Sequence, residues 1–139
     1  MPLNSIASIA SDSEAVAGAN LSAGTIPVWI APMFCTVTRV LWWVSATPTT
    51  SPTVVTPGIS PAGGGAPVTM QNNGANQTIT IPTSQTGGSS GLTLSQDFSG
   101  LNTLNEGDFL SFTSNAGSAN AATTAVTYVI KYTPRTAVP

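Results

Sequence analysis

The stretch that decides the fold class of this 139-residue chain is Phe34-Cys35-Thr36-Val37-Thr38-Arg39-Val40-Leu41-Trp42-Trp43-Val44-Ser45. It is the longest run rich in β-branched and aromatic side chains, which favour strands. Because side chains alternate along a strand, one face should carry Phe34, Thr36, Thr38, Val40, Trp42 and Val44, and the other Cys35, Val37, Arg39, Leu41, Trp43 and Ser45. Toward the C-terminal end both faces are largely apolar, which predicts a central strand covered on both sides.

Shorter strand signals lie on both sides of this stretch, and helix formers other than Ala are scarce. An Asn-Gly pair within 72–76 predicts the turn of a hairpin between 68–71 and 77–81. The Pro- and Gly-rich segments 47–67 and 82–91 are expected to be long loops. The remaining predicted strands are 25–30, with Pro27 favouring a sheet edge, 53–55 inside the first loop, 92–94, 101–104, 109–113 and 125–133. About seven or eight short strands with long loops predict an all-β fold, an antiparallel β-sandwich.

The first 24 residues differ from the rest of the chain. Their few apolar residues are scattered among Ala, Ser, Asn and Gly: Leu3, Ile6, Ile9, Val16 and Leu21. We favour an extended N-terminal arm over 1–24, ahead of a sandwich domain over 25–139, rather than a weak helix near 11–17. An arm with so little core of its own is expected to be held by another chain. Deleting residues 2–22 should then abolish partner binding and leave a folded sandwich.

Charge is nearly absent from this chain. Three Lys or Arg, five Asp or Glu and no His make up 6% of the residues, against about 25% in an average soluble domain. A soluble monomer ordinarily uses charge to keep sheet edges and apolar patches from associating. The scarcity therefore predicts a surface covered by copies of this chain or by a larger assembly. It also argues against nucleic acid as a partner, because phosphates are bound by clustered Lys and Arg.

The same scarcity leaves few groups for chemistry, and we predict neither an enzyme nor a bound cofactor or metal. Without His there is no Ser-His-Asp triad and no His metal site. Glu106 and Asp108 flank Gly107, and a tight turn explains them better than a calcium site or a catalytic carboxylate pair. Cys35 is the only cysteine, which excludes an intrachain disulfide. We expect it to be a buried apolar residue rather than a reactive thiol.

Trp29, Trp42 and Trp43 are the other candidate functional residues. Trp42 and Trp43 must point to opposite faces of their strand, so they cannot form one flat platform. One of them is expected in the core, and Trp29 and Trp43 are candidate contacts, because tryptophan is enriched at interfaces. The alternative is a carbohydrate-binding or adhesin module, in which the 47–67 loop shapes a glycan site beside a tryptophan.

Three segments carry a resemblance to known proteins: Ala31-Pro32-Met33-Phe34-Cys35-Thr36-Val37-Thr38-Arg39-Val40, Leu104-Asn105-Glu106-Gly107-Asp108-Phe109-Leu110-Ser111-Phe112 and Val126-Thr127-Tyr128-Val129-Ile130-Lys131-Tyr132. With the Thr/Pro/Gly-rich middle between them, the chain from about Thr25 onward resembles small β-sandwich structural proteins of tailed bacteriophages. This group includes capsid decoration (cement) proteins and head-fibre or tail-associated modules. The resemblance implies a jelly-roll-like fold, frequent trimers and binding to the outer capsid lattice through loops and arms.

Composition and resemblance together predict a virion structural protein, namely a capsid decoration protein that binds the outer capsid surface and stabilises the shell. The expected partners are further copies, as a homotrimer, and the major capsid protein or another virion protein. The chain start lacks a secretory pattern, and no apolar run approaches the ~20 residues of a membrane helix. We therefore expect assembly in the host cytoplasm, no membrane partner, and residence in the virion. The candidate contact residues are Leu3, Ile6, Ile9, Val16, Leu21, Trp29 and Trp43, and the alternatives are a glycan-binding module of a fibre or tail, or another minor virion component.

Overall fold

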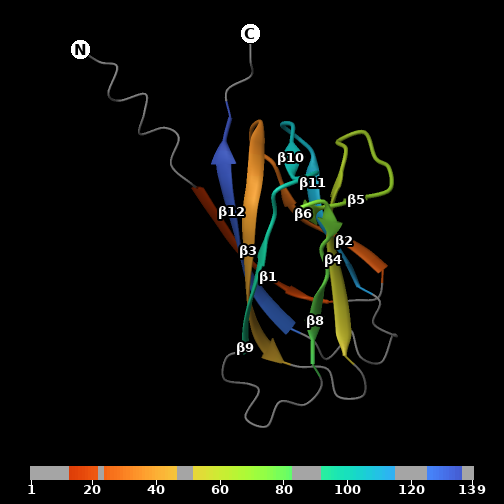
Figure 1. Cartoon of the computed structure of the whole chain (residues 1–139), viewed down its shortest axis with the longest axis vertical. Coiled ribbons are helices and arrows are strands. Elements are labelled where there is room, and N and C mark those ends of the chain that lie inside the picture. Colours follow the sequence, from red (N-terminus) through yellow and green to blue (C-terminus); the bar gives the residue numbers. More distant parts are fainter. Residues whose placement is uncertain (1–12, 22–23, 47–51, 83–91, 115–124, 136–139) are drawn as a thin grey trace, which may run out of the picture.

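Two antiparallel β-sheets packed face to face form the molecule (Figure 1). The structure is a computed structural model, and it describes residues 13–21, 24–46, 52–82, 92–114 and 125–135. Over these residues it contains twelve strands and no helix. All strand pairs described are antiparallel. The predicted all-β antiparallel sandwich is therefore confirmed.

The long strand that the sequence singled out, β3, lies in the middle of sheet A. This sheet runs in the order β1-β12-β3-β10, and β9 also pairs with β3. Sheet B runs in the order β2-β11-β4-β5, with β8 also paired with β4, and β6 and β7 form a separate hairpin. The strands of sheet A are β1 (Ser13–Asn20), β3 (Cys35–Ala46), β9 (Leu92–Asp97), β10 (Thr103–Leu104) and β12 (Ala125–Pro134). Those of sheet B are β2 (Gly24–Ile30), β4 (Thr53–Ser60), β5 (Val68–Thr69), β8 (Ile79–Ile81) and β11 (Phe109–Ser114), and the hairpin is β6 (Gln71–Asn72) and β7 (Ala75–Asn76).

A β-bulge at Thr38 changes which side chains of β3 face the core. On β12, Lys131 lies opposite Arg39. The next residue, Tyr132, lies opposite Val37, which leaves Thr38 without an opposite residue. One extra residue reverses the alternation, so the buried side chains of β3 are Cys35, Val37, Val40, Trp42 and Val44. The two faces expected from strict alternation are therefore wrong over the N-terminal part of the strand.

β3 is central in its sheet, as predicted, but within the described part of the chain only its inner face packs against another sheet. On the outer face Arg39 is exposed, and Trp43 keeps 45% of its surface in contact with solvent. The expectation of cover on both sides is therefore wrong. Sheet A presents an open face to whatever surrounds the protein.

β4 is a full strand in the middle of sheet B, where the sequence predicted a long loop with one short strand. Pro57 lies inside it, and a proline has no N–H to donate to a neighbouring strand. On the side of β4 away from β11, β8 pairs with β4 only as far as Val55, and pairing resumes with β5 at Gly58. Pro57 falls in the gap, where its carbonyl oxygen accepts a hydrogen bond from the Met70 N–H at 3.1 Å. The strand tolerates proline because its neighbour is interrupted there.

The described part of the expected N-terminal arm belongs to the sandwich. β1 pairs with β12 over all eight of its residues. Leu21 follows it, with a side chain only 1% exposed in the core. Ala and Gly are depleted in strands generally, which hid this one in the sequence. Residues 1–12 of the expected arm lie outside the described residues.

An aromatic cluster joins the two sheets. Trp42 of sheet A packs on Phe112 of sheet B with ring centroids 4.4 Å apart, and Tyr128 meets Phe112 edge-on at 5.1 Å. The Tyr128 hydroxyl donates a hydrogen bond to the Val28 carbonyl oxygen of β2 at 2.7 Å. Trp42 is thus the core member of the tryptophan pair, and its neighbour Trp43 points outward.

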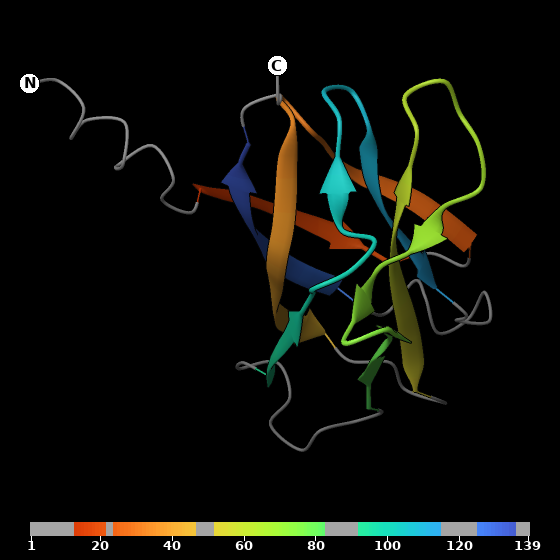
Figure 2. The ribbon, with the colours of Figure 1, turned by 45° about the horizontal axis from the view of Figure 1, so that its top comes forward.

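The predicted hairpin turns at Asn73 and Gly74, whose φ angles of 51° and 79° suit a type I′ turn. Its strands are short because the flanking segments β5 and β8 pair with β4 instead. The hairpin also reaches sheet A (Figure 2). The Gln71 N–H donates to the Gly100 carbonyl oxygen at 2.8 Å, and the Ser99 N–H donates to the Gln71 carbonyl oxygen at 2.9 Å. It therefore links the two sheets.

Candidate interaction surfaces

Cross-strand pairing arranges the outer face of sheet A in rows. Side chains opposite each other on neighbouring strands project to the same face. One row consists of Val16, Val129, Leu41 and Ser95, on β1, β12, β3 and β9. The next row consists of Gly18, Thr127, Trp43 and Thr93. We call the four apolar side chains of these rows, Val16, Val129, Leu41 and Trp43, the outer patch.

The outer patch is apolar surface that solvent still reaches. Val16 is 65% exposed and Trp43 45% exposed, and Val129 and Leu41 between them are half-buried. Single exposed apolar residues are ordinary on any protein. Four of them as neighbours on one sheet face are typical of an interaction site.

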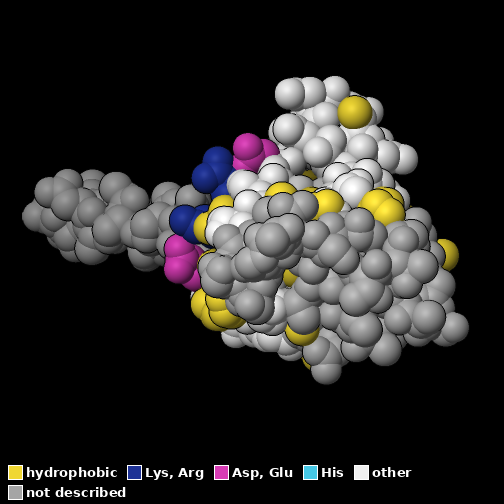
Figure 3. Space-filling model, turned by 90° about the horizontal axis from the view of Figure 1, so that it is seen from below, with side chains coloured by type: hydrophobic (Ala, Val, Ile, Leu, Met, Phe, Trp, Pro, Cys, Tyr) yellow, Lys and Arg dark blue, Asp and Glu magenta, His cyan; other side chains and the backbone are white. Residues whose placement is uncertain are grey.

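A row of charged side chains borders the outer patch. In cross-strand order from β1 to β9 it consists of Glu14, Lys131, Arg39 and Asp97. This row contains two of the chain's three basic residues and two of its five acidic residues. Lys131 Nζ lies 3.3 Å from Glu14 Oε1, and Arg39 Nε donates to Asp97 Oδ1. Figure 3 shows Lys and Arg side chains gathered with Asp and Glu side chains at one margin of the molecule.

Each charge in this row is neutralised by a neighbour. The hydrogen bond and charge of Asp97 raise the pKa of the Arg39 guanidinium above its ordinary value. Both ion pairs are exposed, so they add little to stability. Their consequence is that a partner can approach the outer patch without desolvating an unpaired ion.

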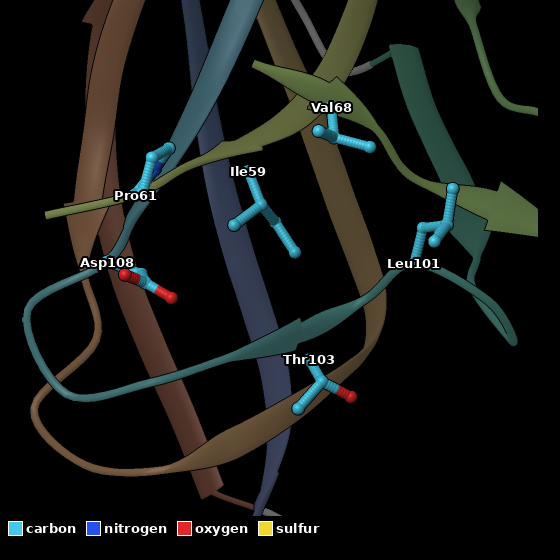
Figure 4. A pocket seen from close by; sticks show the side chains of 6 residues that line it. All are labelled: Ile59, Pro61, Val68, Leu101, Thr103 and Asp108. Atoms are coloured by element: carbon cyan, nitrogen blue, oxygen red, sulfur yellow. The ribbon is translucent and has the colours of Figure 1, made fainter. Parts of the chain in front are cut away.

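A second candidate surface is an open hollow of about 530 Å³ beside β4, β5 and β10. In Figure 4, Ile59 and Val68 project into it from sheet B, and Leu101 and Thr103 stand on the opposite side. Val68 is 52% and Leu101 54% exposed. The hollow offers an apolar seat at one end of the sandwich.

Leu101 holds a strained backbone at the rim of this hollow. Its φ of 51° is left-handed, which costs a residue with a side chain about 1–2 kcal/mol. Strain of this kind persists where the surrounding structure fixes it. Here it accompanies an exposed apolar side chain.

The Glu106-Gly107-Asp108 segment forms the tight turn that the sequence predicts. Gly107 has a φ of 89°. The Asp108 carboxylate accepts hydrogen bonds from the Asn105 N–H at 2.8 Å and from the Ala62 N–H at 3.1 Å. These bonds fasten the 61–67 loop to the turn. Among the described residues, no group of three or more His, Cys, Asp or Glu side chains could hold a metal ion.

Cys35 is a buried apolar residue, as predicted, with none of its surface exposed. Burial, and secondarily the charge of Asp108, raises the pKa of its thiol to about 11. The thiol therefore stays protonated at neutral pH. A protonated, inaccessible thiol is a poor nucleophile.

The seven contact residues predicted from the sequence fall in different places. Val16 and Trp43 meet on the outer patch. Leu21 lies in the core, which corrects its assignment as a contact, because its side chain cannot reach a partner. Trp29 is half-buried, with its ring centroid 4.8 Å from that of Tyr132. The other three, Leu3, Ile6 and Ile9, lie outside the described residues.

Sequence reasoning missed Leu41 and Val129 as contacts. Alternation along 125–133 does place Val129 opposite the core-facing side chains, and it is half-buried in the structure. The sequence does not reveal the register of β12 with β3, which brings Leu41 beside Val129. That the two residues belong to one patch follows from this strand pairing.

The glycan alternative required the 47–67 loop beside a tryptophan. The hollows that Pro61 and Pro67 line are built from aliphatic residues, Thr, Gly and Asp, without a tryptophan. Among the described residues these two hollows therefore bring no tryptophan beside the loop, and glycan binding stays a prediction. No helix among the described residues is long and apolar enough to cross a membrane.

No family model and no curated protein matches this sequence. Its fold resembles chains in two solved phage capsids. A chain in the capsid of Ralstonia phage GP4 aligns with a TM-score of 0.58 and 16% identity, over 91% of this chain and 86% of that one. A chain in the acidic stable capsid of Helicobacter pylori bacteriophage KHP30 aligns with a TM-score of 0.54 and 15% identity, over 91% of this chain and 90% of that one. At such identities the likeness shows a shared β fold.

Proposed function

We propose that this chain is a structural protein of a bacteriophage virion, and specifically a decoration protein that binds the outer capsid surface and stabilises the shell. The observation that carries the proposal is the outer patch, an apolar sheet face bordered by charges that neutralise one another. The fold likeness to chains of two phage capsids supports a capsid as the partner.

The proposed mechanism is mechanical. Docking the outer patch on a shell protein removes apolar side chains from water, which contributes about 25 cal/mol per Å². Interface cores are depleted in charge, and the outer patch meets that condition. A shell repeats the contact many times, so each bound copy adds surface that must be exposed again before the shell opens. This role needs no catalytic group, and we propose none.

Further copies of the chain and the shell protein are the proposed partners, in a virion assembled in the host cytoplasm. The resemblance to decoration proteins suggests trimers. Light scattering of the purified chain measures the number of copies.

The proposal is tested with the double variant Leu41→Ser/Trp43→Ser. Both side chains lie on the outer face, so the variant should keep the fold, as measured by circular dichroism. Co-expressed with the shell protein of the phage that encodes this chain, it should fail to sediment with particles, whereas the wild type should sediment with them.

The matched control is Val68→Ser/Leu101→Ser, which removes two apolar side chains exposed at the hollow. It should bind particles like the wild type. Binding by the outer-patch variant at the wild-type level would overturn the proposal. Loss of binding only in the hollow variant would show that the protein docks through the hollow and not through the outer patch.

A further inference from the structure

The edge of sheet A at β1 lacks the devices that keep edge strands apart. Natural edges are protected by Lys, by Pro, by bulges or by shortness. β1 has eight residues, Ser-Glu-Ala-Val-Ala-Gly-Ala-Asn, with neither Lys nor Pro. Its one charged residue, Glu14, is already paired with Lys131. Its pairing with β12 runs without a register shift, and among the described residues no other strand pairs with it.

The other sheet edges in the described part of the chain are protected. β2 carries Pro27, and its register shifts between Leu110 and Ser111 of β11. β5, β8 and β10 are two or three residues long. β9 has six residues and ends at Asp97. The longest unprotected edge is therefore β1.

We propose that β1 pairs with β1 of a second copy, antiparallel about a two-fold axis that passes between the two Val16 residues. A two-fold axis perpendicular to the sheet keeps the outer face of both copies on the same side, so Val16 meets its own counterpart. This register covers Val16, which is 65% exposed. It also sets Glu14 opposite Gly18 of the second copy, where the missing side chain leaves room for the carboxylate. Like charges never lie opposite each other, which would destabilise the pairing.

The same register makes one continuous surface from two outer patches. The row Ser95, Leu41, Val129 and Val16 continues across the axis into the same row of the second copy in reverse order. The charged row of one copy then lines up with the Gly18, Thr127 and Trp43 row of the other. No charged row meets its own copy. Pairing of β1 with β1 of the second copy therefore doubles the area of the outer patch without bringing like charges together. This holds whatever partner the outer patch binds.

Val16→Cys tests the register directly. Residues opposite each other in antiparallel strands have Cα atoms about 4.5–5.5 Å apart, within the span of a disulfide, about 4.4–6.8 Å. Cys35 is the only native cysteine and is fully buried, so it will not compete. We expect the oxidised variant to run as a covalent dimer on a non-reducing gel at high dilution.

The matched control is Ser95→Cys, an exposed position of the same row on β9, which should stay monomeric on the gel. If Val16→Cys gives no more covalent dimer than Ser95→Cys, the proposal is overturned. A crosslink that forms only when the two variants are mixed would replace it with pairing of β1 to β9 of the next copy.

Ala17→Lys tests the same edge without a crosslink. A lysine on an exposed edge strand opposes edge-to-edge pairing. Sedimentation should find the wild type as a dimer, or as a multiple of dimers, and should find Ala17→Lys in half as many copies with an unchanged circular dichroism spectrum. The control Thr93→Lys, on β9, should keep the wild-type mass. A monomeric wild type, or a trimer that Ala17→Lys leaves intact, would contradict the proposal.

Discussion

Arg39 of β3 lies directly opposite Lys131 of β12, on the outer face of sheet A. Two like charges in such a cross-strand pair destabilise a sheet. Here each is flanked on its other side by an acid, Glu14 beside Lys131 and Asp97 beside Arg39. The four side chains therefore act as one unit across four strands. A chain with so few charges uses them to neutralise one another at the border of an apolar face.

Removing one acid should expose the repulsion between the two basic side chains. Glu14→Gln leaves Lys131 next to Arg39 without its own partner. We expect the free energy of unfolding in urea to fall by about 0.2–1 kcal/mol at low salt and the loss to shrink at high salt, because ions screen exposed charges. Ser95→Ala, in the neighbouring row, should change neither value. A loss that is the same at both salt concentrations would contradict the coupling.

Gln96 offers a position where stability should rise. Its side chain is 5% exposed, and neither of its polar side-chain atoms has a hydrogen-bond partner among the described residues. An unsatisfied buried polar group costs about 1–3 kcal/mol. We expect Gln96→Met, which keeps the length of the side chain, to raise the free energy of unfolding by an amount up to that range. A decrease in urea unfolding experiments would show that the amide is satisfied, for example by a buried water.

The Cys35 thiol should make the fold sensitive to alkali. Its pKa rises from 9.0 to about 11 on folding, so the folded state favours the protonated thiol. This stability is fully present below pH 9 and is lost as the pH rises through about 11. Two pKa units correspond to at most about 2–3 kcal/mol.

The matched variant is Cys35→Ala, which should flatten the stability profile between pH 9 and 11 in urea unfolding. Tyr128, whose pKa is also raised by burial, should keep a residual slope at higher pH. Parallel profiles for the two proteins would show that the thiol does not contribute.

Local pattern located most strands because alternation survives wherever pairing is regular. Over 125–133 it places Val126, Tyr128 and Ile130 on one face, and all three are buried. It failed in β3 because nothing in the sequence around Thr38 marks a bulge. The pattern failed in β4 because a proline such as Pro57 usually indicates a loop. The strand accommodates Pro57 only because the neighbouring strand is interrupted there. These failures are tertiary effects.

The candidate site could be predicted only as single residues. Val16 and Trp43 stood out as apolar residues outside the expected core. Their proximity depends on the register of β1 with β12 and of β12 with β3. These strands are distant in the sequence, and no local signal encodes how they pair. The charged row was equally hidden, because its four members come from four separate segments.

The role of β1 changes what an N-terminal truncation should do. Deleting residues 2–12 keeps the whole of β1, which begins at Ser13, so this truncation should retain the pairing of β1 with β12. Deleting residues 2–22 should destabilise the protein strongly, because it uncovers β12 and removes the buried Leu21. Losing a buried leucine side chain alone costs about 2–5 kcal/mol. Equal melting temperatures for the two truncations would show that the sandwich does not need β1.

Deleting Thr38 should be tolerated well for a deletion inside a central strand. Without Thr38, Val37 directly precedes Arg39, so strict alternation keeps Arg39 on the outer face and leaves Cys35 and Val37 on the core face. The loss should be limited to the hydrogen bonds that Thr38 makes, such as the one its hydroxyl donates to the Lys131 carbonyl oxygen, about 0.5–1.5 kcal/mol each. Urea unfolding and near-ultraviolet circular dichroism measure it.

Two controls separate the bulge from deletion in general. Deleting Leu41, where the pairing with β12 is regular, should turn one half of the buried side chains of β3 away from the core. Burial of one valine contributes about 1.5–3 kcal/mol, so this deletion should remove a large share of the ~5–15 kcal/mol that stabilises an ordinary domain. Thr38→Val keeps the bulge and loses only the 3.2 Å hydrogen bond to the Lys131 carbonyl oxygen, a cost of about 0.5–1.5 kcal/mol. If deleting Thr38 were as damaging as deleting Leu41, the bulge could not be what reverses the alternation in β3.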